Sequence, residues 1–338
     1  MTQQAESATP RRNVRRKRLR RIGIGFLVLI GLLTVDYFAY PRFIGIGGRS
    51  FSSGGNGLWI RYTWYFGMKS ETEISELIKG MTRRQIKYVY PHVRYIRKDG
   101  SLRYRYPDSG RRLVNRIHLR APEVRVIAWI YAGNSRGAGE VDLSQSGVRA
   151  RMVEEAIWLT KECGFDGVQW DYEICPDGDL NFLALMRETR AALPPGKILS
   201  TAVPMWLPWP LGRWGWSEDY FGKVARTCDQ LVVMGYDSGF WLPRSYVWLM
   251  RQQTTRVTNA AHAANPDCRV LIGVPTYGKG FLSHNPHAEN IRMALKGVRE
   301  GVADSGVGRR SFAGVAVFAD YTTQPDEWDT YEELWLGK

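Results

Sequence analysis

The segment DGVQWDYE, residues 166–173, decides the fold of this chain and carries two acidic side chains within it. Its short apolar and aromatic run after an Asp-Gly pair predicts a buried strand. Side chains alternate along a strand, so Gln169, Asp171 and Glu173 should point to one face. Two carboxylates that face a protein interior cannot easily both stay ionised, and one should have a raised pKa. The segment therefore predicts a strand that ends in a general acid.

Similar strand patterns recur on both sides of this segment and alternate with amphipathic helical patterns. Alternating strands and helices imply a parallel sheet. Eight strands in about 280 residues match a (β/α)8 barrel, predicted here over residues 58–338. An open doubly wound sheet is the alternative, but no G-x-G-x-x-G follows an early strand. The predicted strands are 58–66, 86–95, 124–132, 166–173, 198–204, 230–237, 270–277 and 313–319, with helices at 146–163, 179–193, 217–226, 243–264 and 287–304.

Residues suited to chemistry stand at the ends of other predicted strands. Barrel enzymes carry their active sites at the C-terminal ends of the strands and on the loops that follow. Tyr236 and Asp237 end the sixth predicted strand, Tyr277 ends the seventh, and Phe318 lies near the end of the eighth. A structural ion pair is the alternative for the fourth strand, but no Lys or Arg shares the face of Asp171. We therefore expect these side chains to surround the carboxylate pair.

Four segments form an ordered set along the chain: FDGVQWDYE (165–173), VVMGYD (232–237), LIGVPTYG (271–278) and FAGVAVFA (312–319). In this order they resemble the motifs of strands four, six, seven and eight of glycoside hydrolase family 18, the chitinase-like barrels. The set covers about residues 58–320. The resemblance implies a (β/α)8 barrel that cleaves a glycan containing N-acetylhexosamine, with no metal or organic cofactor.

The resemblance also implies catalytic roles for particular residues. Family 18 enzymes use the substrate's own 2-acetamido group in place of a second carboxylate. Glu173 would protonate the leaving glycosidic oxygen and then act as the base for water. Asp171 would orient the acetamido group and balance the charge of the intermediate. Tyr236 and Asp237 would hydrogen-bond the acetamido group or the sugar.

Two positions depart from the family pattern. Gln169 stands where the family has its first acidic residue of the fourth strand. An amide can donate a hydrogen bond to Asp171 but cannot share a proton with it, which predicts an ionised Asp171. Phe318 stands where the family usually has the Trp beneath the sugar, and its ring offers less area for stacking. Met234 and Tyr277, from the motifs of the sixth and seventh strands, complete this part of the predicted substrate-binding set.

Aromatic residues gather in two predicted loops. PMWLPWPLGRWGW, residues 204–216, holds four Trp and three Pro, and Trp241 follows the sixth predicted strand. Flat rings at the top of a barrel suit the stacking of sugars, so Trp206 and Trp241 are predicted to bind substrate. Packing of the loop against a helix, or contact with a membrane interface, is the alternative for these rings.

The N-terminus predicts a membrane anchor. Residues 1–21 hold eight Lys and Arg with one Glu, and residues 22–40 are apolar apart from Thr34 and Asp36. A run of this length is near the minimum that spans a bilayer as a helix. The basic block places residues 1–21 in the cytoplasm and the barrel outside. A cleaved signal peptide is the alternative, but residues 37–40 are bulky for a cleavage site. Residues 41–57 are predicted to be a linker.

The charge, His and Cys content of the chain bears on three further features: nucleic-acid binding, metal binding and disulfide bonds. The formal net charge is +14, but half of the excess lies in the N-terminal tail, so the barrel is only mildly basic and nucleic acid is not a predicted partner. The five His residues show no metal-ligand spacing. Cys228 and Cys268 each precede one of two adjacent predicted strands, and a disulfide between them would be allowed outside the cytoplasm. We therefore predict that bond and no metal site.

Together these features predict a single-pass, inner-membrane protein of bacterial type with an extracytoplasmic glycosidase barrel. The substrate would be a chitin-like polymer, peptidoglycan or an exopolysaccharide. A catalytically weak, glycan-binding barrel is the alternative; the presence of Glu173 favours an enzyme, whereas Gln169 keeps the alternative open. Asp171 as a nucleophile on another sugar fits less well, because two carboxylates two residues apart on one strand cannot flank a bond on both sides.

Overall fold

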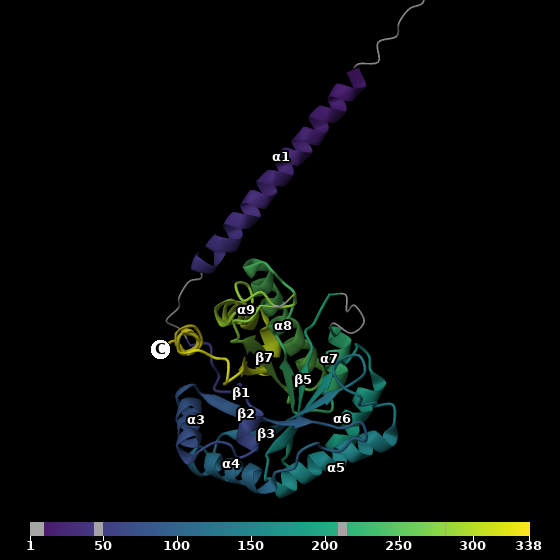
Figure 1. The fold of residues 1–338 in the computed structure, drawn as a ribbon, viewed down its shortest axis with the longest axis vertical. Coiled ribbons are helices and arrows are strands. Elements are labelled where there is room, and N and C mark those ends of the chain that lie inside the picture. The colour runs from purple at the N-terminus through teal and green to yellow at the C-terminus, as the bar shows by residue number, and fades with distance from the viewer. Residues whose placement is uncertain (1–9, 44–49, 209–214, 281) are drawn as a thin grey trace, which may run out of the picture.

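The eight strands form a closed parallel barrel in the order β1 to β8, with β8 paired to β1. The helices surround this barrel as a ring (Figure 1). The computed structural model describes residues 10–43, 50–208, 215–280 and 282–338. The (β/α)8 fold predicted from the sequence is confirmed. The strands are β1 (Asn56–Ile60), β2 (Ile86–Tyr95), β3 (Arg125–Gly133), β4 (Gly167–Glu173), β5 (Ile198–Val203), β6 (Gln230–Val233), β7 (Arg269–Pro275) and β8 (Phe312–Phe318).

Helices connect successive strands and bury the outer wall of the barrel. Their inward faces and the outward faces of the strands share one extended apolar core. The helices are α1 (Pro10–Ala39), α2 (Tyr62–Tyr65), α3 (Glu71–Arg83), α4 (Pro107–Arg120), α5 (Ser146–Glu162), α6 (Leu180–Ala192), α7 (Glu218–Ala225), α8 (Pro243–Ala264), α9 (Ile291–Asp304) and α10 (Pro325–Tyr331). Shorter turns of helix are η1 (Tyr40–Phe43), η2 (Gly306–Arg310) and η3 (Glu332–Leu336).

Two strands are shorter than the sequence pattern predicts. β1 ends at Ile60 rather than near residue 66, because the Asp320 carboxylate accepts hydrogen bonds from the Arg61 backbone N–H (3.2 Å) and the Trp64 indole (2.8 Å) and turns the chain into α2. β6 ends at Val233 rather than at residue 237. There the Gly235 carbonyl accepts from the Tyr246 hydroxyl instead of from a neighbouring strand.

A layer of hydrogen-bonded polar side chains crosses the interior of the barrel. The Trp59 indole donates to Gln169 Oε1 (2.8 Å), and Gln169 Nε2 donates to Ser200 Oγ (3.1 Å). The hydroxyls of Ser200 and Tyr90 both donate to Gln230 Oε1, each at 2.8 Å. The five side chains come from five different strands, so this network ties opposite walls of the barrel together. Buried polar groups are tolerated here because each finds a partner.

Asn56 completes the closure between the first and last strands. Its side chain is fully buried, and its Nδ2 donates to Ser52 Oγ (2.9 Å) and to the Gln85 carbonyl (3.2 Å). Its Oδ1 accepts from the Val315 backbone N–H (3.2 Å) and from the Trp335 indole (2.8 Å). One amide therefore links β1, β8, the end of α3 and the C-terminal segment.

We predict that Asn56→Ala destabilises the protein by roughly 2–4 kcal/mol, because buried donors on β8 and Trp335 lose their acceptor. Urea unfolding of the full chain in detergent, followed by Trp fluorescence, measures the change. Asn181→Ala, the same substitution at an exposed position of α6, is the control and should change the free energy of unfolding by about 0.5 kcal/mol or less. Equal effects at the two positions would contradict this role of Asn56.

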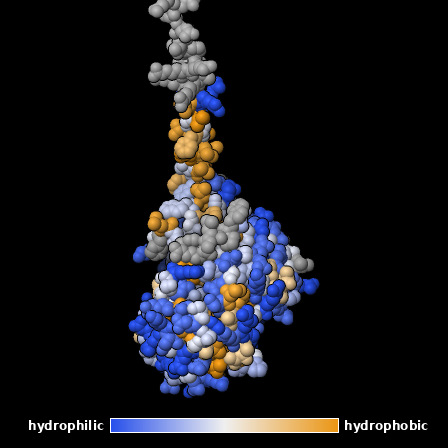
Figure 2. All heavy atoms as spheres, turned by 90° about the vertical axis from the view of Figure 1, so that its right-hand side faces the viewer, coloured by the Kyte–Doolittle hydropathy of each residue, from blue (hydrophilic) through white to orange (hydrophobic). Residues whose placement is uncertain are grey.

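Helix α1 extends away from the barrel as an exposed apolar rod. Within the described residues, the segment Arg18–Arg42 is a helix long and apolar enough to cross a membrane, and its apolar window is not buried against the barrel. Figure 2 shows this hydrophobic rod standing out from a largely hydrophilic barrel surface. It matches the predicted span at 22–40, and it begins within the basic segment. Residues 1–9 of the predicted tail lie outside the described residues.

The C-terminal end of α1 contacts the barrel beside α8. The Arg244 guanidinium donates to the Asp36 carboxylate, with Nη2–Oδ1 2.6 Å, and stacks over the Tyr40 ring at 4.2 Å. The His287 Nε2 donates to the Tyr37 carbonyl (2.8 Å), and the two rings lie 4.2 Å apart. Arg244 follows β6 and His287 follows β7. The helix therefore rests on loops at the C-terminal side of the barrel strands.

Residues 50–55, the described end of the predicted linker, lie against the barrel. The Phe51 backbone N–H donates to the Trp335 carbonyl (3.0 Å), and the Ser53 hydroxyl donates to the Ala313 carbonyl (2.6 Å). Residues 44–49 of the linker lie outside the described residues. The final residues of this segment are therefore part of the folded domain.

The predicted disulfide between Cys228 and Cys268 is wrong for this structure. Both cysteines are free and buried, with their Sγ atoms 3.9 Å apart. They do lie side by side because each precedes one of the paired strands β6 and β7. The strand order explains their proximity, but the two sulfurs contact one another as thiols.

Candidate active site

The C-terminal ends of β4, β5 and β6 surround a cavity of about 330 Å³. Four residues singled out from the sequence line it: Glu173, Met234, Tyr236 and Asp237. The closed barrel brings them together because the strand ends meet around one rim. The remaining lining residues are Tyr172, Ile174, Cys175, Pro204, Met205 and Ser283.

Asp171 lies beneath this cavity with one hydrogen-bond donor. Its side chain is 3 % exposed, and its Oδ2 accepts from the Trp129 indole at 2.8 Å. Oδ1 has no hydrogen-bond partner among the described residues. Burial raises the pKa of Asp171 well above its usual range, the Glu173 carboxylate raises it further, and the Trp129 hydrogen bond opposes both. Simultaneous ionisation of Asp171 and Glu173 is therefore disfavoured in the free protein.

The predicted role of Gln169 toward Asp171 is wrong. Gln169 is fully buried in the polar layer below, where its amide donates to Ser200 and its oxygen accepts from Trp59. Neither polar atom bonds to Asp171, so the expected stabilisation of an ionised Asp171 by this amide is absent. Trp129 takes that place, because it is the residue paired beside Gln169 on the neighbouring strand.

Glu173 is a carboxyl group whose environment favours the protonated form. Burial raises the pKa of Glu173, an effect that Asp171 opposes and that the nearby Asp237 carboxylate reinforces. Two neighbouring carboxyl groups on the same face of one strand, here the buried Asp171 and the partly exposed Glu173, titrate as a pair rather than independently. The raised pKa values favour a proton on this pair, and Glu173, which lines the cavity, can deliver it.

Aromatic rings support the cavity from below. The Tyr236 and Phe318 rings stack with centroids 4.7 Å apart, and the Trp59 ring meets Phe318 edge-on at 5.6 Å. Burial raises the pKa of Tyr236 well above its usual range, and the acidic side chains of the site add to the effect. The Tyr236 phenol therefore stays protonated and can donate a hydrogen bond to a bound oxygen.

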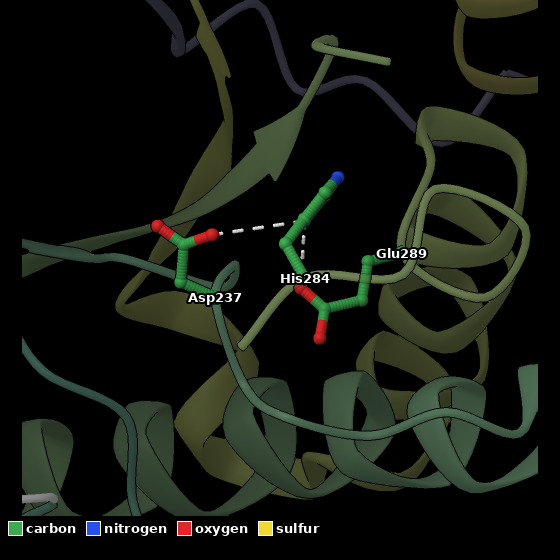
Figure 3. Close-up of side chains that lie close together, drawn as sticks. All are labelled: Asp237, His284 and Glu289. Carbon is green, nitrogen blue, oxygen red and sulfur yellow. Dashed lines mark hydrogen bonds and ion pairs between the residues drawn. The ribbon is translucent and has the colours of Figure 1, made fainter. Parts of the chain in front are cut away.

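Asp237 is held by two residues that follow β7. The Tyr277 hydroxyl donates to Asp237 Oδ1 at 2.7 Å, and His284 Nδ1 lies 3.7 Å from the same oxygen. His284 Nδ1 also lies 3.2 Å from Glu289 Oε2 (Figure 3). His284 and Glu289 are buried, whereas Asp237 is half-exposed at the cavity. The two loops after β6 and β7 are thus joined through Asp237.

These three side chains are also the described residues that could together hold a metal ion, since their ligand atoms all lie within 4.8 Å. Their hydrogen bonds to neighbouring loop residues give these side chains a structural role. His284 Nε2 donates to the Tyr277 carbonyl (3.1 Å), and the Ser238 backbone N–H and hydroxyl both donate to Glu289 Oε1. The buried pair therefore forms a hydrogen-bonded support for Asp237.

The aromatic residues predicted to stack on sugars lie outside the cavity lining. Trp206 is 6 % exposed and packs beneath the Arg256 guanidinium, 4.4 Å from the ring centroid. Its backbone N–H donates to Gln253 Oε1 at 2.6 Å, which fixes the loop against α8. Trp241 is 55 % exposed at the start of α8, near the end of α1. Trp209 and Trp214 lie outside the described residues.

Several residues of the site were missed by sequence reasoning. Trp129 belongs to the apolar run of the third strand, and its alternation with Tyr131 is the signal that could have placed it inside the barrel. His284 and Glu289 lie in an irregular loop and at its end, where no periodic pattern predicts a contact with Asp237. Their position behind Asp237 follows from the packing of the loop after β6 against the loop after β7.

The family model of the glycosyl hydrolases of family 18 matches residues 62–335. This match covers most of the chain and every residue that lines the catalytic cavity. The chain therefore belongs to glycoside hydrolase family 18, and its barrel is chitinase-like.

Curated relatives and solved structures agree with this family. Endochitinase 1 of Metarhizium anisopliae is 23 % identical over 197 residues, which are 53 % of this chain and 44 % of the relative. The chain thus spans less than half the length of this relative. The C-terminal domain of a putative chitinase from Desulfitobacterium hafniense superposes with a TM-score of 0.59, 17 % identity and coverage of 83 % of this chain and 97 % of that one. The spore cortex-lytic enzyme SleL of Bacillus cereus superposes with a TM-score of 0.57 at 12 % identity, over 83 % and 74 % of the two chains.

We predict that Asp237→Asn shifts the alkaline limb of the kcat/KM profile to lower pH. The Asp237 carboxylate raises the pKa of Glu173, so its removal lowers that pKa and Glu173 loses its proton at lower pH. The amide oxygen can still accept from Tyr277, which preserves the loop contact. The pH–rate profile of the purified full chain measures the shift. An alkaline limb that stays in place or moves upward contradicts the assignment of that limb to Glu173.

Proposed function

We propose that this family 18 enzyme hydrolyses a glycan containing N-acetylhexosamine by substrate-assisted retention, with Glu173 as the acid and base. The observation that carries the proposal is the buried Asp171, whose Oδ1 has no hydrogen-bond partner in the described structure and whose Oδ2 is held by Trp129. The Oδ1 atom of Asp171, next to the general acid Glu173, can accept a hydrogen bond from the N–H of a 2-acetamido group. That contact would align the acetamido carbonyl for attack on the anomeric carbon.

The proton balance of this reaction needs only one residue that lines the cavity. Glu173 gives its proton to the glycosidic oxygen as the bond to the anomeric carbon breaks, and the acetamido oxygen forms the new bond. The resulting oxazolinium carries positive charge, which Asp171 balances. Glu173, now ionised, takes a proton from the incoming water, and the ring opens with retention. The Tyr236 phenol donates to the acetamido oxygen while this charge develops.

The names of the similar proteins support a structural or cell-wall polysaccharide as the substrate class. An endochitinase and a spore cortex-lytic enzyme share this family or fold. We propose a chitin-like polymer, peptidoglycan or an exopolysaccharide as the substrate, bound at the C-terminal face of the barrel.

A location at the inner membrane, with the barrel outside the cytoplasm, is the second part of the proposal. The exposed apolar helix α1 and the cations at its N-terminal side support it. The contacts of Asp36 and Tyr37 with Arg244 and His287 would hold the barrel close to the point where α1 leaves the bilayer. The exposed Trp241 ring beside this contact suits the membrane interface.

Glu173→Gln tests the chemistry. The amide keeps the shape of the carboxyl group but cannot transfer a proton, so turnover should fall by at least about 10²–10⁴-fold. Binding of the same glycan should be retained. Mass spectrometry of products from a glycan panel measures turnover, and fluorescence titration measures binding.

Glu123→Gln, the same change at an exposed position before β3, should leave turnover unchanged. Near-wild-type turnover by Glu173→Gln would show that the assigned role is wrong. If the wild-type chain binds glycans and cleaves none, the glycan-binding alternative is correct.

A reporter fused after Lys338 tests the topology. A reporter enzyme that is active only outside the cytoplasm should be active there, because the N-terminal cations keep residues 1–21 inside. Replacing the eight cations of residues 11–21 with Gln should reduce this activity. A fusion that is active only when the reporter is of the cytoplasmic type contradicts the proposed orientation.

A further inference from the structure

A second, larger cavity of about 670 Å³ lies beside the catalytic strand at the C-terminal ends of β2 and β3. Tyr131 and Gly133 line it, and they pair with Asp171 and Glu173 in the β3–β4 ladder. Neighbouring strands are about 4.8 Å apart, so this cavity is one strand removed from the proton donor. A polymer bound at Glu173 can therefore extend into it.

Both walls of this second cavity are held in place by backbone contacts. One wall is a hairpin in which Ile96 bridges Leu102, the Arg103 N–H donates to the Tyr95 carbonyl (2.9 Å), and the Arg97 N–H donates to the Ser101 carbonyl (2.8 Å). The other wall is the loop after β3. In that loop the Asn134 N–H donates to the Glu173 carbonyl at 2.8 Å, so the wall is attached to the catalytic residue's own backbone.

The charge of this cavity is opposite to that of the catalytic cavity. Arg97, Lys98 and Arg103 line it, against the single carboxylate of Glu140. Across the described parts of the chain, none of these three cations forms an ion pair with an acidic side chain. The catalytic cavity, by contrast, is lined by the carboxyl groups of Glu173 and Asp237, and its lining includes no cation from the described residues. Cations that outnumber the carboxylates around a cavity attract an anion.

His92 contributes a buried polar atom to the lining of the same cavity. Its ring stacks on Trp129 with centroids 3.9 Å apart, and its Nε2 is buried without a hydrogen-bond partner. Burial, reinforced by Arg94, lowers the pKa of His92 to about 3, so the ring is neutral. A buried polar atom without a partner is costly, and a ligand that contacts it would remove that cost. Tyr95 and Tyr131 present rings that suit the face of a sugar.

We propose that this second cavity is a subsite for a sugar that carries an anionic substituent, so that the substrate is an anionic polymer of N-acetylhexosamine rather than neutral chitin. The substituent is a carboxylate or a phosphate, since Arg97 and Arg103 can bind either with charge-assisted hydrogen bonds. The sugar ring lies against Tyr95 and Tyr131. This inference rests on the proposed function and specifies its substrate class.

The experiment compares matched neutral and anionic glycans with the purified full chain in detergent. De-peptidised peptidoglycan strands with free lactyl carboxylates are compared with the same strands converted to methylamides. Chitin oligomers phosphorylated at the 6-hydroxyl are compared with unmodified oligomers. The expected result is a higher kcat/KM for at least one anionic member, and a preference that declines as salt is raised. Which pair shows the preference identifies carboxylate or phosphate as the substituent.

The double variant Arg97→Ala and Arg103→Ala should lower kcat/KM on the preferred anionic glycan by about tenfold or more. It should lower kcat/KM on the neutral counterpart much less, because that glycan lacks the anionic substituent. Lys87→Ala with Arg125→Ala is the matched control, because these cations lie on β2 and β3 at the end of the barrel opposite to the cavity. The control removes the same net charge and should preserve the preference.

Equal cleavage of neutral and anionic members, or an equal loss on both in the double variant, overturns the anionic subsite while leaving the proposed function intact. Failure of the proposed function is distinguishable, because cleavage would then persist in Glu173→Gln or be absent for every glycan. In that case binding of the same glycans to Glu173→Gln still tests the subsite. Tighter binding of the anionic member that is lost with Arg97→Ala and Arg103→Ala supports it, and equal binding rejects it.

Discussion

The alternation of side chains along β4 is the constraint on which the site depends. In a closed barrel every second residue points inward, so Gln169, Asp171 and Glu173 must all enter a low-dielectric interior. Each then needs a partner or a raised pKa. Gln169 bonds to Trp59 and Ser200, Asp171 accepts from Trp129, and Glu173 reaches the cavity. From Gln169 to Glu173, the inward side chains of β4 change from fully hydrogen-bonded to accessible from the cavity.

This change in hydrogen bonding along β4 explains why the layer of Gln169 stabilises the fold whereas the layer of Asp171 can bind a ligand. The layer of Gln169, Ser200 and Gln230 is satisfied within itself and links opposite strands, so it contributes to the specificity of the fold. The layer of Asp171 retains one oxygen without a partner in the described structure, which leaves recognition of a ligand possible. A substitution of Gln for an acid in the lower layer is therefore compatible with an active upper layer.

The loops after β6 and β7 connect three features of the molecule. They carry Asp237 and its support His284, and the end of α1 is contacted by His287 in the second loop and by Arg244 at the start of α8. A membrane helix placed there would hold one side of the cavity rim near the bilayer. The second cavity lies at the ends of β2 and β3, on another part of the same rim. The contact with α1 and the cluster of cations are therefore on different parts of the C-terminal face of the barrel.

The sequence by itself determined the barrel, its strand order, the apolar N-terminal helix and the acid at the end of β4. Each of these features follows from local periodicity or from a contiguous motif. It placed Met234, Tyr236 and Asp237 at the cavity for the same reason. Only the tertiary structure decided the partners: Trp129 rather than Gln169 for Asp171, His284 and Glu289 behind Asp237, and a packed position for Trp206. It also decided that three cations from one hairpin would face a cavity beside the acid. Those contacts join segments distant in the chain, and their geometry follows from barrel closure and loop packing, which no local pattern encodes.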